Sequence, residues 1–113
     1  MPNEAITVTN DTWTVTGTVV NTNTSRRADG VQVKLYDKDR IGRDDSLGVA
    51  TTDNEGVFTI TFNQEDFQEL IFDRKPDLYF RVVRGTIVLL NTESTPIQNA
   101  DENTPMMTLE VRY

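Results

Sequence analysis

The chain has 113 residues, with 18 acidic and 11 basic side chains and a net charge of −7, and it contains neither cysteine nor histidine. It can therefore form no disulfide, no thiolate nucleophile and no site that depends on an imidazole, such as a Ser-His-Asp triad or a histidine-ligated zinc. The acidic balance also argues against nucleic acid as a partner, because an acidic surface repels the phosphate backbone. The length is that of one ordinary domain.

The beginning of the chain divides into a polar segment and a strand. Residues 1–11 show little periodicity, and we expect a tail or an edge segment there, followed by a single domain over residues 12–113. The first residues have no basic region before an apolar block, so no signal peptide is predicted. From 12 to 20 the sequence TWTVTGTVV alternates, with Trp13 and Val19 on one face, which is typical of a β-strand.

Three further strands and one helix are predicted in the middle of the chain. The runs 31–36, 47–51 and 57–62 alternate between apolar and polar side chains. The connection TDNEG, residues 52–56, is predicted as a tight turn because its glycine tolerates a positive φ. One short helix is predicted around residues 64–71, where acidic side chains follow a capping asparagine.

The last third of the chain adds the strands that close the domain. The runs 78–83, 86–90 and 106–113 alternate in the same way, and a polar loop separates the last two. The longest apolar run, 87–90, is far shorter than the roughly 20 residues of a membrane helix, so no transmembrane segment is predicted. Seven short strands with regular turn signals predict an all-β fold, a seven-stranded antiparallel β-sandwich.

Three motifs resemble those of transthyretin-like domains: G-x-V at 17–19, G-V-x-V-x-L-Y-D at 30–37 and T-D-x-x-G-x-F at 52–58. On these residues the chain is similar to prealbumin-like and carboxypeptidase-regulatory-like sandwiches over about residues 12–90. The resemblance implies an accessory or interaction module. One enzyme branch of the broader fold hydrolyses 5-hydroxyisourate and relies on histidines, which this chain lacks, so we expect no enzyme activity.

Acidic side chains gather after the strand that ends at residue 36. Oxygen ligands of this kind suit a hard cation such as Ca²⁺, and calcium is the one cofactor that the sequence suggests. The stretch from Leu35 to Gly48 resembles the calcium-binding loop of C2 domains, which runs W-D-x-D-x-x-x-x-D-D-x-[IL]-G. The alternative is a solvated acidic turn, neutralised by neighbouring lysine and arginine side chains. The candidate metal ligands are Asp37, Asp39, Asp44, Asp45 and Asp53.

The function predicted first is a non-catalytic binding or structural module that acts through protein–protein contacts, as a small subunit or adaptor of a larger bacterial assembly. The alternative is a calcium-dependent domain that binds lipid headgroups or carbohydrate through the Asp37–Asp45 loop. Exposed strand edges would allow pairing with a protein partner or with a second copy of the chain. Trp13, Tyr36 and Tyr79 are interpreted as packing residues rather than as a ligand platform. The compartment stays open between the cytoplasm and export without a classical signal.

Overall fold

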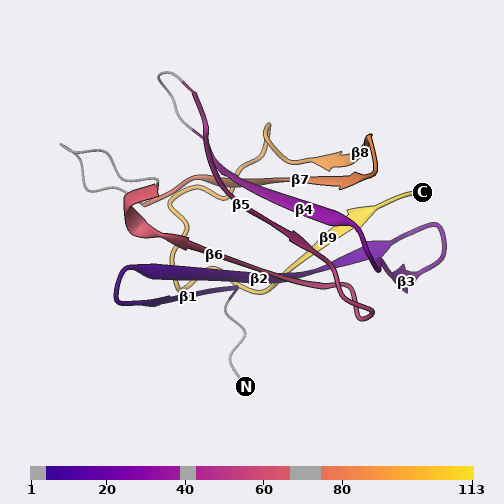
Figure 1. Ribbon diagram of the computed structural model, residues 1–113, viewed down its shortest axis with the longest axis horizontal. Helices are drawn as coiled ribbons and strands as arrows, with labels where there is room; N and C mark the ends of the chain where they lie inside the picture. Colours follow the sequence, from indigo (N-terminus) through magenta and orange to yellow (C-terminus); the bar gives the residue numbers. More distant parts are fainter. Residues whose placement is uncertain (1–4, 39–42, 67–74) are drawn as a thin grey trace.

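The computed structural model describes residues 5–38, 43–66 and 75–113, which form two β-sheets packed as separate layers (Figure 1). This arrangement confirms the predicted all-β sandwich. The first sheet contains β1 (Ile6–Thr9), β2 (Thr12–Asn21), β3 (Arg26–Arg27), β6 (Val57–Asn63) and β9 (Met107–Val111). The second sheet contains, in spatial order, β5 (Asp45–Thr51), β4 (Gln32–Asp37), β7 (Leu78–Arg84) and β8 (Ile87–Asn91).

The strand count and one pairing differ from the sequence prediction. The described residues form nine strands rather than seven, because the short strands β1 and β3 pair with the two ends of β2. The sheet is also not purely antiparallel, because β9 runs parallel to β2, from the pair Gly17–Met107 to the pair Asn21–Val111. Parallel neighbours need a long connection rather than a hairpin. Strands β3 to β8 lie between β2 and β9 in the chain, and the polar segment after β8 returns it from the second sheet to the first.

A hairpin near the start of the chain was not predicted from the sequence. Strands β1 and β2 are joined by a two-residue turn in which Asn10 has φ 49° and Asp11 has φ 66°. Positive φ at both central residues is the geometry of the tight hairpin turns that asparagine and aspartate tolerate. The Asn-Asp pair between two threonine-rich runs was the available signal. Ile6 of β1 is fully buried in the core.

The predicted helix around 64–71 is described only in its first turn. A 3₁₀ turn, Gln64–Asp66, follows β6, and the rest of the predicted range lies outside the described residues. The turn is capped by the Asp66 carboxylate, which accepts a hydrogen bond from the backbone N–H of Asn63 at 2.9 Å. In the described ranges no helix is long and apolar enough to cross a membrane.

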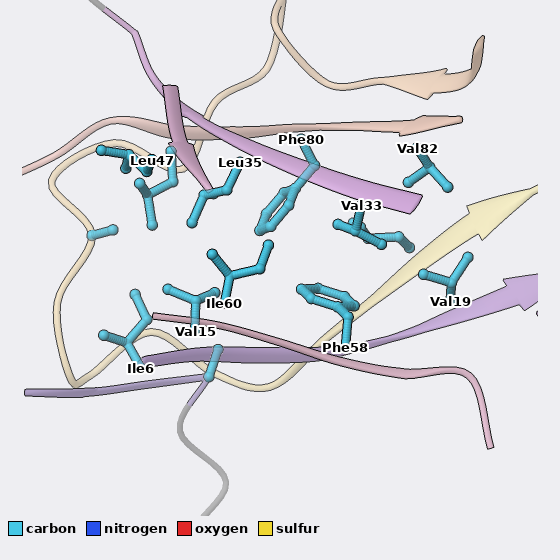
Figure 2. Packing of buried hydrophobic residues seen from close by; sticks show 14 of the residues in the cluster. Ile6, Val15, Val19, Val33, Leu35, Leu47, Phe58, Ile60, Phe80 and Val82 are labelled. Carbon is cyan, nitrogen blue, oxygen red and sulfur yellow. The ribbon is translucent and has the colours of Figure 1, made fainter. Parts of the chain in front are cut away.

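The core lies between the two sheets and is built by the predicted inward-facing positions. Side chains of β2 and β6 in one sheet meet those of β4 and β7 in the other, as Figure 2 shows for Ile60, Val15 and Leu35. The rings of Phe58 and Phe80 form an edge-to-face pair across the layers, with centroids 5.7 Å apart and an interplanar angle of 66°. Full burial of one such side chain stabilises the fold by about 1.5–3 kcal/mol.

Glycine at position 17 makes room for this aromatic contact. Gly17 is paired with Phe58 across β2 and β6. A Cβ atom at position 17 would lie 2.6 Å from Cζ of Phe58 and 3.0 Å from Cγ of Met107. Because real Cβ atoms do not approach so closely, any larger residue here would displace the Phe58 ring.

Thr52 forms hydrogen bonds that stabilise the chain where it passes from the second sheet back to the first. Its buried hydroxyl donates to the carbonyl of Ala28 at 2.6 Å and accepts from the N–H of Val31 at 3.1 Å. Its backbone N–H donates to the carbonyl of Val31 at 2.9 Å. These bonds join the loop before β4 to the turn after β5, and they explain the threonine that begins the T-D-x-x-G-x-F motif.

We expect Thr52→Val to destabilise the protein by about 1–3 kcal/mol, because it leaves a buried N–H and a buried carbonyl without their partner while conserving side-chain volume. Chemical denaturation measures the change. Thr51→Val is the matched control, since Thr51 is exposed on the neighbouring position of β5. Equal stability of the two variants would contradict the role assigned to the Thr52 hydroxyl.

Candidate functional site

Three of the predicted acids belong to the same end of the β4–β5 hairpin. Strand β4 ends at Asp37 and β5 begins at Asp45, and these two residues are direct neighbours in the sheet, with Asp44 next along the chain. Asp53 follows the far end of β5 and therefore lies at the opposite end of the same hairpin. Asp39 lies outside the described residues.

Asp37 has a structural role in the described part of the site. Its side chain is fully buried, and its Oδ1 accepts a hydrogen bond of 2.9 Å from the backbone N–H of Asp77. The carbonyl of Asp77 in turn accepts a 2.8 Å bond from the N–H of Lys38. Asp37 thereby fixes the segment that leads into β7, and a buried carboxylate needs such partners because its desolvation is costly.

Asp44 contacts the outer face of the second sheet. Its Oδ2 accepts a 2.6 Å hydrogen bond from the hydroxyl of Tyr79. Burial of Tyr79, followed by this bond, raises the pKa of the phenol well above its usual range. The phenol therefore stays protonated and acts as a hydrogen-bond donor, which excludes it as a base near neutral pH.

Two cations converge on Glu93 above the stacked tyrosines. Lys38 Nζ lies 2.7 Å from Glu93 Oε2, and Arg81 Nη2 lies 3.3 Å from Glu93 Oε1. The hydrogen bond between Lys38 and Glu93 lowers the pKa of the carboxyl and raises the pKa of the ammonium. The Arg81 guanidinium also covers the ring of Tyr36 at 5.0 Å, and that ring stacks on Tyr79 with centroids 5.0 Å apart.

These contacts bear on the tyrosines that were considered as a ligand platform. Tyr79 is 2% exposed, and Tyr36 has one ring face against Tyr79 and the Arg81 guanidinium near it. Trp13 is also buried, stacks on Phe62 at 5.8 Å and donates from Nε1 to Gln64 Oε1 at 3.2 Å. The geometry agrees with a packing role, because the faces of these rings contact other side chains of the protein.

A groove of about 610 Å³ lies beside this charge cluster, between the start of β7 and the loop after β8. Its volume is within the range of small-ligand and peptide sites. No sequence pattern predicted it, because its wall comes from three separate segments and the loop carries no recognisable motif. The lining residues are Lys38, Asp77, Asn91, Glu93, Ser94, Pro96 and Gln98.

The calcium site stays a prediction. Within residues 5–38, 43–66 and 75–113, no three acidic side chains are close enough together to hold a metal ion. A calcium ion needs six to eight oxygen ligands, so the three acids at this end would need further ligands.

Asp53 has a local role in the turn between β5 and β6. Its Oδ1 accepts hydrogen bonds from the N–H groups of Glu55 at 2.8 Å and Val57 at 2.9 Å. Gly56 follows with φ 73°, and a Cβ there would lie 2.6 Å from the carbonyl oxygen of Val19. Asp53 therefore does not join the other acids, and the T-D-x-x-G-x-F motif is a turn motif in this structure.

Comparisons with known proteins agree with this architecture. The sequence model of the transthyretin-like family matches residues 16–83, well over half of the chain. A crystal structure of a 9R-lipoxygenase from Cyanothece PCC8801 has a similar fold, with a TM-score of 0.66 and 22% identity over 96% of this chain. The chain spans only 19% of that lipoxygenase chain, and the likeness shows a shared fold alone. No curated protein matches the sequence significantly.

We expect Glu93→Gln to lower the melting temperature at pH 7 and to have a smaller effect in acid. The pKa of Glu93 is lower in the folded than in the unfolded chain, so its ion pairs stabilise the fold at neutral pH. That contribution is lost as the pH falls through the folded-state pKa. Thermal melts across this range measure the difference, and Glu110→Gln, an exposed carboxylate of β9, is the control. An effect of the same size at neutral pH and throughout the acid range would contradict the assignment.

A calcium site at the β4–β5 loop would raise the melting temperature in millimolar Ca²⁺ because the ion would bind the folded state only. Asp45→Asn should remove this increment. Asp53→Asn should keep it, since Asp53 lies at the other end of the hairpin. The absence of any shift in the unmodified protein would rule out calcium.

Proposed function

Because this chain belongs to the transthyretin-like family, we propose that it is a non-catalytic binding module that works through protein–protein contacts. The family suggests a binding or structural module. A sandwich of the same fold forms part of a much longer lipoxygenase chain, so this fold can serve within a larger protein. A small subunit or adaptor of an assembly fits both observations.

The observation that carries the proposal is the exposed, uncharged edge of the second sheet. Strand β8 pairs with β7 on one side, and in the described residues no strand pairs with its other side. Its side chains at Ile87 and Val88 are 63% and 57% exposed. An edge strand offers free backbone N–H and C=O groups to a partner strand, and many proteins block such edges with lysine or proline. β8 contains neither.

The opposite edge of the same sheet is less suited to a partner. Strand β5 begins with Asp45 and Ser46. Val49, which is 57% exposed, is its large apolar side chain on the surface. The uncharged β8 edge buries more apolar surface on pairing with a further strand, and apolar burial is the main favourable term in association.

Val88→Lys tests the β8 edge, because a lysine on an edge strand opposes pairing with a further strand. Val49→Lys is the matched control, since Val49 is equally exposed on the other edge strand of the same sheet. We expect the unmodified protein and Val49→Lys to retain the partner in stoichiometric amounts after affinity capture from the native source. We expect Val88→Lys to lose it.

Light scattering on the purified proteins separates a foreign partner from a second copy of the chain. A dimer that Val88→Lys converts to a monomer would identify self-pairing at β8. Two results would contradict the proposal: a monomer that captures no partner from the native source, or a complex that Val88→Lys leaves intact.

A further inference from the structure

We propose that the groove beside β8 receives the basic N-terminal end of an extended protein segment that adds to β8 as a further strand. The inference rests on the proposed function and names the chemistry of its partner. Asn91 connects the two surfaces, because it is the last residue of β8 and also lines the groove. A chain paired along β8 would therefore reach the groove where the strand ends.

The central feature of the groove is the rigidly held carboxylate of Asp77. Its backbone N–H donates to Asp37 Oδ1 at 2.9 Å and its carbonyl accepts from Lys38 at 2.8 Å. Its own Oδ1 accepts from the N–H of Asn99 at 2.8 Å. Three hydrogen bonds thus fix the position of the carboxylate before any ligand arrives, which reduces the entropy lost on binding.

Of the two carboxylates that line the groove, Asp77 is the one without a cationic partner among the described residues. The other acid, Glu93, is neutralised by Lys38 and Arg81, at 2.7 and 3.3 Å. In the described part of the chain Asp77 forms no ion pair, and its side chain is half-buried. A lysine or arginine side chain entering the groove would provide the missing cation, and it would be attracted by the protein's net charge of −7.

The rest of the lining suits a peptide backbone. Ser94 and Gln98 form no side-chain hydrogen bond with the described residues, and the Asn91 amide uses only its oxygen, which accepts from Glu93 N–H at 3.0 Å. Amide and hydroxyl groups of this kind can donate to and accept from peptide groups. Pro96 adds one apolar contact surface.

The direction of the added strand follows from the sheet. All neighbours in the second sheet are antiparallel, and antiparallel pairing is slightly more stable per residue than parallel pairing. A strand antiparallel to β8 begins beside Asn91, where β8 ends. The basic residue is therefore placed at the N-terminal end of the partner segment.

Three N-acetylated, C-terminally labelled octapeptides test the inference by fluorescence anisotropy on the full chain: KTVTVTVT, QTVTVTVT and TVTVTVTK. We expect the first to bind about three- to tenfold more tightly than the other two, as for a charge-assisted hydrogen bond. Asp77→Asn should reduce this preference to about one, while it keeps the bond from Asn99. Glu110→Gln should leave the preference unchanged, and thermal melts of each variant confirm that it is folded.

The outcomes separate the groove from the edge. If the three peptides bind equally well and Val88→Lys weakens their binding, the role of the groove is overturned and the proposed function stands. A preference for the peptide with lysine last overturns the direction of the strand. Binding that is insensitive to Val88→Lys, or no binding at all, overturns strand addition at β8, and this inference with it.

Discussion

The contact between Phe58 and Phe80 joins the two layers of the sandwich, and the rest of the structure depends on it. Phe58 reaches across the core because Gly17 on the neighbouring strand leaves space beside its ring. Phe80 lies on β7, one of the two central strands of the second sheet, which also carries Tyr79 and Arg81 on its outer face. The inner packing therefore sets the position of the outer residues, because successive side chains of one strand point to opposite faces.

Buried polar groups then fasten the two ends of the second sheet. At one end the hydroxyl of Thr52 joins the loop before β4 to the turn after β5. At the other end the Asp37 carboxylate accepts a hydrogen bond from the N–H of Asp77. The Asp77 carboxylate in turn accepts one from the N–H of Asn99, which positions the loop after β8. Each group would be costly if it were unpaired, so each specifies one arrangement of its loops. The hydrogen bond from Asp77 to Asp37 stabilises the fold and also positions Asp77 in the wall of the groove.

The aspartates show how one residue type takes different roles in one small domain. Asp37 is a buried anchor, Asp44 accepts from Tyr79, and Asp53 organises a turn. Asp77 alone among these presents a half-buried carboxylate to a groove without an ion pair in the described ranges. The sequence prediction grouped the first three with Asp39 and Asp45 as metal ligands, because residues that are close in the sequence are easier to recognise than residues that are close in space.

The sequence by itself determined the period-two strands, the faces that enter the core and the turn at residues 52–56, because alternation and turn chemistry are local properties. It also determined that these 113 residues supply no imidazole and no thiol, since the sequence contains neither histidine nor cysteine. Only the tertiary structure decided that β9 runs parallel to β2, that Asp53 lies away from Asp37 and that a groove forms around Asp77. These features depend on how the chain crosses between the sheets, and residues far apart in sequence meet there through packing that no local pattern encodes.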